Sequence, residues 1–148
     1  MVGRCRLRPS PDGGCPVLSR VPSDLPAETE DVMNKIIGAC IEVHRHLGPG
    51  FLESAYHRAT CIELRERRLA FTIKKRVAVS YKGHQLASQE LDLIVESCVV
   101  VEIKAVAQLE EIHGAQLIAY LRATGLRAGL LVNFNKPVLR AGLRRIVL

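Results

Sequence analysis

Two carboxylates, Asp92 and Glu102, lie within short apolar runs, where a buried strand is not expected to carry charge. The runs span 91–95 and 99–103 and are separated by a polar break at 96–98. This pattern predicts a buried β-hairpin. Two carboxylates on neighbouring strands repel each other, and burying them is costly, so something must offset that cost. A divalent cation such as Mg²⁺ that bridges both would explain the pair, because hard cations choose carboxylate oxygens.

The length of the hairpin loop decides whether the two carboxylates meet. With a three-residue loop, antiparallel pairing places Asp92 directly opposite Glu102 on one face of the sheet. Lys104 lies two residues further along, so it shares that face and can neutralise one carboxylate. A two-residue loop would put Asp92 opposite Val101 and separate the carboxylates. A solvated hairpin face, on which Glu102 and Lys104 simply balance each other, is the alternative.

The composition describes one globular domain with a basic surface. The chain has 148 residues, of which 48% are hydrophobic and 24% charged, enough for one hydrophobic core. Its formal net charge of +6 favours a polyanionic partner. No apolar run approaches the roughly 18 residues of a membrane span, and no apolar segment follows the N-terminal arginines, which argues against a secretory signal.

The five cysteines are odd in number and form no Cys-x-x-Cys pair, which argues against a disulfide framework and favours a reducing, cytoplasmic environment. Cys40 with His44, and His57 with Cys61, are each four residues apart in expected helices, a spacing that could supply four zinc ligands. The simpler explanation is that these cysteines are small buried apolar residues.

The N-terminal part of the chain divides into a leader and two helices. Residues 1–28 are rich in proline and glycine and lack a hydrophobic period, so we expect a disordered leader before one domain at 29–148. Thr29 is the expected cap of a helix that ends near His46. The sequence Gly-Pro-Gly then precedes a second helix at about 51–68.

A three-stranded antiparallel meander is expected next, at 71–81, 84–95 and 99–104. Its first turn is the dipeptide Lys82-Gly83, a two-residue hairpin loop. The remaining expected elements are a helix that starts at Leu109 or Glu110 and ends at Thr124, a buried strand at 129–133 and an edge strand at 144–148.

A cluster of basic side chains ends the second expected helix and continues into the first strand. A solvated helix end is the simpler explanation for its helical part, and contact with phosphates is the alternative. The candidates for nucleic-acid binding are Arg65, Arg67, Arg68, Lys74, Lys75 and Arg76.

The order of these elements and motifs resembles the PD-(D/E)xK nuclease superfamily. The motifs are Asp92, then Glu102-Ile-Lys104, then Gln116-x-x-x-Tyr120, of which the last looks like that of the RecB-like branch. Leu91 stands where the name of the motif has proline, a position that is loosely kept.

A second resemblance concerns the segment Gly50-Phe-Leu-Glu53-Ser-Ala-Tyr56, which is similar to the signature of the small GxxExxY protein family. The similarity runs from about Thr29 to Leu148. It implies an α/β fold with a restriction-endonuclease-like core (α-β-β-β-α-β), in which helices flank a mixed central sheet, plus an extra N-terminal helix.

The resemblance also implies a metal site. Asp92 and Glu102 would hold Mg²⁺ or Mn²⁺, with the Ile103 carbonyl as a third ligand and Glu53 as the additional carboxylate.

Three more side chains receive catalytic roles from the same resemblance. Lys104 would position the attacking water and stabilise developing negative charge, or help to deprotonate the water if its pKa were lowered. Gln116 would orient water or phosphate. Tyr120 would support the site or contact the nucleic-acid backbone.

The expected function is therefore a metal-dependent nuclease that hydrolyses phosphodiester bonds, in DNA rather than RNA. A chain this compact often needs a second copy to cut both strands, so a homodimer is one expectation, and a partner protein could supply targeting. The first alternative is a non-catalytic nucleic-acid-binding or assembly module on the same fold. The second is a homo-oligomeric interaction protein in which the charged trio is structural.

Overall fold

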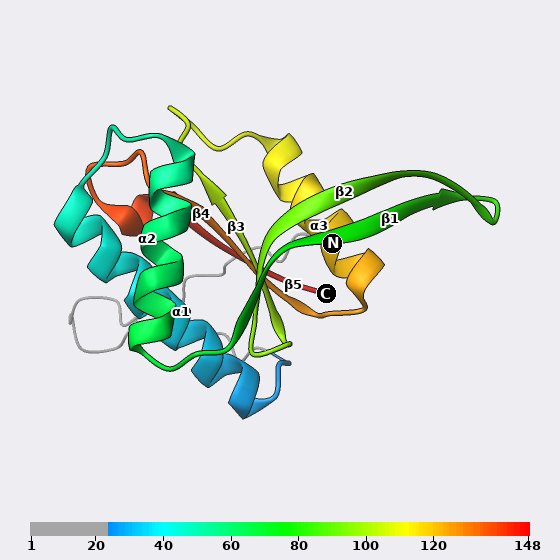
Figure 1. Ribbon diagram of the computed structural model, residues 1–148, viewed down its shortest axis with the longest axis horizontal. Coiled ribbons are helices and arrows are strands. Elements are labelled where there is room, and N and C mark those ends of the chain that lie inside the picture. The colour runs from blue at the N-terminus through cyan, green and yellow to red at the C-terminus, as the bar shows by residue number, and fades with distance from the viewer. Residues whose placement is uncertain (1–23) are drawn as a thin grey trace, which may run out of the picture.

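The computed structural model describes residues 24–148, so most of the expected leader lies outside the described residues. One five-stranded sheet, in the order β1-β2-β3-β4-β5, lies between helices (Figure 1). The elements are α1 (Ala27–Leu47), α2 (Glu53–Glu66), β1 (Phe71–Tyr81), β2 (His84–Val95), β3 (Val99–Lys104), α3 (Glu111–Thr124), β4 (Ala128–Asn133), the short 3₁₀ helix η1 (Leu139–Gly142) and β5 (Leu143–Val147).

The sheet is mixed, as predicted. Strands β3 and β4 pair in parallel, whereas every other neighbouring pair is antiparallel. The parallel pair needs a long crossover, which α3 supplies. With the two helices before β1, this arrangement is the predicted restriction-endonuclease-like core with an extra N-terminal helix.

Two hydrophobic cores hold the layers together, one on each face of the sheet. Helices α1 and α2 pack on one face, against side chains such as Leu93 and Ile103. Helix α3 packs on the other face, against Leu91 and Val100 among others. Because helices cover both faces of the sheet, β4 is buried at every position and β3 is buried at every position except its last.

The helix boundaries differ from those expected from the sequence. The prediction that Thr29 caps the first helix is wrong, because α1 begins at Ala27 with Pro26 at the cap position and no side-chain cap. Helix α2 ends at Glu66, since Arg68 has a left-handed backbone (φ 57°) that cannot continue it. In residues 24–148 we find no helix that is long and apolar enough to cross a membrane.

Strands β1 and β2 form a long hairpin that projects from the body (Figure 1). Its bounds and the two-residue turn at Lys82-Gly83 are as predicted. We call residues 78–90 the arm, because nearly all of their side chains are exposed. The base of the hairpin, by contrast, joins the sheet and leads directly to Asp92.

Candidate active site

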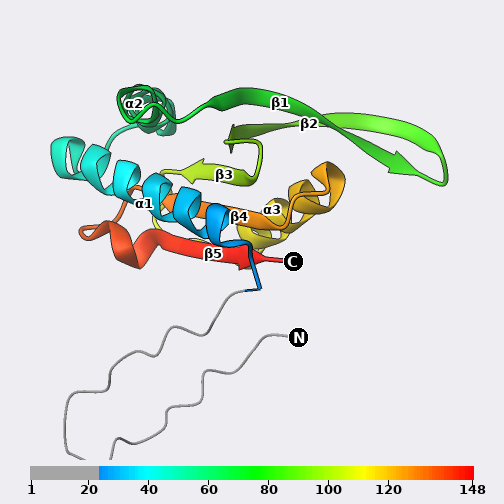
Figure 2. The same ribbon diagram turned by 90° about the horizontal axis from the view of Figure 1, so that it is seen from below.

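The hairpin of β2 and β3 has a three-residue loop, which is the loop length that places Asp92 opposite Glu102. Val95 pairs with Val99, and regular pairing continues to Leu93 and Val101. Beyond that pair the two strands separate (Figure 2). The next position on β2 is Asp92, so its side chain lies at the opening of a fork between the strands.

Side chains replace strand pairing in this fork. The Asp92 carboxylate accepts a hydrogen bond from the Ile103 amide at 2.8 Å. The Glu102 carboxylate lies 3.5 Å from the Asp92 amide nitrogen. Each acidic side chain therefore approaches the backbone of the opposite strand, and the two carboxylates are held side by side.

Glu102 is a buried carboxylate, with only 4% of its side chain exposed. Burial, and secondarily the charge of Asp92, raises its pKa to about 7. Lys104 opposes this shift, since its Nζ lies 3.2 Å from a Glu102 carboxylate oxygen. The alternative of a solvated hairpin face is therefore wrong, because both partners of this ion pair are largely shielded from water.

Lys104 keeps its positive charge in this setting. Burial lowers its pKa, but Glu102, Glu53 and Asp92 together outweigh burial, and the net pKa is raised. Of the two roles expected for Lys104, electrostatic stabilisation therefore fits these surroundings, whereas proton abstraction would need the opposite shift.

Helix α3 brings a second pair of predicted residues to the fork. The Gln116 amide donates a hydrogen bond to the Tyr120 hydroxyl at 2.9 Å, and this hydroxyl donates to the carbonyl of Glu90 at 3.1 Å. Burial, followed by the charge of Glu102, raises the pKa of Tyr120. Tyr120 thus connects α3 to β2 two residues before Asp92.

The segment Gly50 to Tyr56 holds the start of α2. The Tyr56 hydroxyl accepts from the Phe51 amide at 3.1 Å and donates to the Gly48 carbonyl at 2.6 Å, while its ring stacks on Phe134 at 4.6 Å. Tyr56 is fully buried, although it lies only three residues after Glu53 on α2. Glu53 remains exposed as the first residue of α2.

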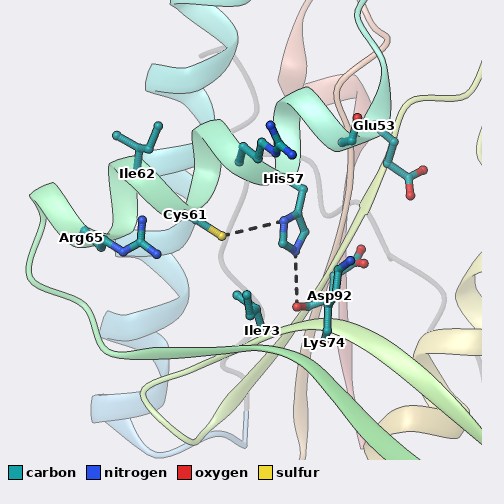
Figure 3. Close-up of a pocket in the computed structure, with 10 residues that line it drawn as sticks. Glu53, His57, Cys61, Ile62, Arg65, Ile73, Lys74 and Asp92 are labelled. Carbon is teal, nitrogen blue, oxygen red and sulfur yellow. Dashed lines mark hydrogen bonds between the residues drawn. The ribbon is translucent and has the colours of Figure 1, made fainter.

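A pocket of about 700 Å³ lies between α2 and the base of the β1–β2 hairpin (Figure 3). Its lining includes both Glu53 and Asp92. Figure 3 also shows His57 directed from α2 toward β2, where its Nε2 lies 3.5 Å from the Asp92 carbonyl oxygen. Sequence reasoning missed His57 as a neighbour of Asp92. The signal that could have found it is its position one helical turn after Glu53.

Within residues 24–148, no three His, Cys, Asp or Glu side chains are placed to hold a metal ion by themselves. The zinc alternative is therefore wrong. Cys40 is fully buried, and His44 bonds to the Lys136 carbonyl oxygen at 2.7 Å. Cys61 lies 3.9 Å from a ring nitrogen of His57, without a third partner of those types nearby among the described residues.

Asn133 is a second residue that sequence reasoning missed. It is completely buried at the end of β4, beside Lys104 in the parallel pairing. Its side chain accepts from the Val106 amide at 3.0 Å and donates to the Val106 carbonyl at 2.8 Å. Asn133 therefore fixes the chain just after Lys104. A polar residue ending a wholly apolar strand was the available signal.

The six basic candidates have different surroundings. Arg65 lies over the Phe71 ring. Arg65 and Lys74 both line the pocket. Arg67 pairs with Glu63 at 2.7 Å. Arg68 is exposed in the turn after α2, and Lys75 and Arg76 are exposed along β1 toward the arm.

Comparison with known proteins decides the family. The family model of the PD-(D/E)XK nuclease superfamily matches residues 30–146, which is most of the chain. The chain belongs to this superfamily. A search of curated proteins and a search of solved structures gave no match.

Membership in the PD-(D/E)XK superfamily gives the fork a chemical context. The superfamily generally hydrolyses phosphodiester bonds, typically with divalent metal ions, so nucleic acid is the substrate class that it implies. The match covers all of the candidates described above, from Glu53 on α2 to Tyr120 on α3.

Proposed function

We propose that this protein is a Mg²⁺- or Mn²⁺-dependent nuclease that hydrolyses phosphodiester bonds in DNA. The observation that carries the proposal is the convergence of Asp92, Glu102 and Lys104 where β2 leaves β3. Asp92 reaches the Ile103 amide at 2.8 Å, and Lys104 reaches Glu102 at 3.2 Å. A charged trio built into the base of a buried hairpin is costly for folding, so a role in chemistry is the economical explanation.

The donor set fits a hard divalent cation. Asp92, Glu102 and the Ile103 carbonyl would hold the ion, and Glu53 at the pocket mouth would add a carboxylate. Mg²⁺ is usually bound by one or two carboxylates and keeps several waters, so the Asp92 and Glu102 pair is a donor set of the kind that it uses. When bound, such an ion polarises the phosphate and lowers the pKa of a coordinated water.

The surrounding side chains supply charge and position. Lys104, kept protonated by its acidic neighbours, would stabilise the negative charge that develops on the phosphate oxygens. From its position on α3, Gln116 would orient water or a phosphate oxygen. Tyr120 would support the site through its bond to the Glu90 carbonyl, which holds β2 in place beside Asp92.

We also propose the narrower assignment to the GxxExxY group and to a RecB-like Gln-x-x-x-Tyr arrangement. Gly50 adopts φ 105°, a backbone that favours glycine, and Tyr56 closes the loop that follows it. In this assignment the signature would serve to present Glu53 at the first position of α2. The four-residue spacing of Gln116 and Tyr120 allows their mutual hydrogen bond.

The test is calorimetric titration of Mn²⁺ into the protein and into Asp92→Asn, followed by incubation with plasmid DNA. We expect binding and cleavage in the wild type. Both should be lost in Asp92→Asn, and cleavage should also be lost in Glu102→Gln and Lys104→Ala. Glu66→Gln, an exposed carboxylate at the far end of α2, is the matched control and should behave as wild type.

Cleavage retained in all three site variants would refute the nuclease proposal. Salt-dependent DNA binding without metal binding or turnover, unchanged in Asp92→Asn, would favour the non-catalytic binding module instead.

A further inference from the structure

The pocket beside Asp92 forms a groove that follows α2. Four of its lining residues, Glu53, His57, Cys61 and Arg65, are each four positions apart and so form one row along the helix. Twelve residues of helix span about 18 Å at 1.5 Å per residue. The groove, which we call the α2 groove, therefore leads from the candidate active site to Arg65.

Charges along the α2 groove favour an anionic occupant. Arg58, Arg65 and Lys74 line it, and its two carboxylates, Glu53 and Asp92, are the ones assigned above to the metal site. Lys74 also has an unusual backbone for a strand residue, with φ 48°. It lies between pairs that match Ile73 with Leu93 and Lys75 with Leu91, which places it opposite Asp92.

Apolar side chains alternate with these cations. Ile62 on α2 is 57% exposed and Ile73 on β1 is 47% exposed, and both line the groove. Single exposed aliphatic residues are common on protein surfaces. Two of them in one cationic groove offer apolar surface to the faces of nucleobases. Proteins that bind single strands likewise combine a cationic groove with side chains that contact the base faces, although those side chains are typically aromatic.

We infer that the α2 groove binds one unpaired nucleic-acid strand and leads it to Asp92. The inference rests on the proposed nuclease function and narrows its substrate to a single-stranded segment, such as an overhang, flap or separated end. Paired bases are stacked inside a duplex and cannot present their faces to Ile62 or Ile73. An unpaired strand can, while its phosphates contact Arg58 and Arg65.

Fluorescence anisotropy with a labelled single-stranded oligonucleotide tests this inference. EDTA is present throughout, so that binding is measured without cleavage. The variants are Arg65→Gln and Ile62→Asn. Their matched controls are Arg140→Gln and Ile112→Asn, since Arg140 and Ile112 are also exposed but do not line the groove. The comparison probes are a duplex of equal length and a strand of the same length built from abasic sites.

We expect Arg65→Gln to reduce the slope of log K against log salt concentration by about 0.7, the value for one phosphate contact with a single strand. We expect Ile62→Asn to weaken binding of the normal strand about fivefold and to leave binding of the abasic strand unchanged. Both control variants should match the wild type, and the duplex should be insensitive to either groove variant.

Three results would overturn the inference. These are single-strand binding that neither groove variant alters, equal effects of Ile62→Asn on the normal and abasic strands, and equal effects of both groove variants on duplex and single strand. Failure here is separable from failure of the nuclease proposal. Metal-dependent cleavage that still requires Asp92 would survive loss of the groove, whereas groove binding in EDTA would survive loss of cleavage.

Discussion

The Asp92 carboxylate takes the place of a strand partner for the Ile103 amide, at a distance of 2.8 Å. Regular pairing of β2 with β3 stops at Leu93 and Val101, so this bond is the shorter of the two side-chain contacts that tie β2 to β3 at the fork. Asp92 therefore has a structural role besides the metal-binding role that we propose for it. The two roles can be separated, because only one of them requires a negative charge.

Asp92→Asn and Asp92→Ala should differ in stability. Asparagine retains an oxygen that can accept from Ile103, whereas alanine does not. In EDTA we expect the alanine variant to be less stable than the asparagine variant by about 1 kcal/mol, the typical contribution of one hydrogen bond. Urea unfolding measures the difference, and amide hydrogen exchange at Ile103 should be faster only in Asp92→Ala. Equal exchange in both variants would contradict this role.

The metal-free protein should lose stability as the pH rises. The pKa of Glu102 is about 7 in the folded protein, against 4.5 for an ordinary glutamate. Between these two pH values the folded state keeps a proton that the unfolded chain has released. The contribution of Glu102 to the unfolding free energy is therefore largest below about pH 4.5, and it falls as the pH rises through 7. The total loss is on the order of 3 kcal/mol.

Urea unfolding in EDTA at pH 5 and at pH 8, which bracket most of that change, measures the fall in unfolding free energy. The fall is at most about 1.4 kcal/mol for each pH unit. Glu102→Gln should flatten the dependence, because the amide does not titrate. An unchanged slope in Glu102→Gln would assign the effect to other groups. Added Mn²⁺ should stabilise the wild type more at pH 8 than at pH 6, since protons and metal compete for the same carboxylates.

The Gln116 and Tyr120 side chains should behave as a coupled pair. Tyr120→Phe removes the hydroxyl that joins Gln116 to the Glu90 carbonyl, and we expect a loss of about 1 kcal/mol in unfolding free energy. In a double-mutant cycle with Gln116→Ala, the two losses should add to more than the loss in the double variant. Strict additivity would show that the hydrogen bond between them contributes nothing.

Asn133→Ala should destabilise the protein more than an exposed amide substitution does. It removes both bonds to Val106 and leaves partly buried backbone groups without these partners, for which we expect a loss of about 2 to 4 kcal/mol. Asn135→Ala, at a partly exposed position two residues later, is the control and should cost less than about 1 kcal/mol. A similar loss in both variants would contradict the role given to Asn133.

Much of the local structure was accessible from the sequence. The turn at Lys82-Gly83 and the loop at 96–98 were both predicted correctly, and the loop sets the register of β2 on β3. The register of β1 on β2 was not predicted, because it shifts by one residue between Val79 and Ser80. Turn geometry depends on a few adjacent residues, and burial follows from the apolar runs on either side of it. The approach of Asp92 to Glu102 followed from the same local rules.

The basic residues show where sequence reasoning stopped. Arg65, Arg67 and Arg68 are close in the chain, yet one lines a pocket, one pairs with Glu63 and one lies in a turn. Side chains near the end of a helix point in different directions around its axis, so closeness in sequence did not give them the same contacts. Their separate surroundings depend on where α1 and β1 pack.

What the sequence determined by itself was the set of elements, the register of β2 on β3 and the charged residues of the hairpin. Only the tertiary structure decided that β2 bends away at Asp92. Leu91 packs in the core under α3, whereas Leu93, two residues later, packs under α1 and α2. Regular alternation would put both on one face. The change of face arises because helices cover both sides of the sheet, and it is this packing that opens the fork in which Asp92, Glu102 and Lys104 meet.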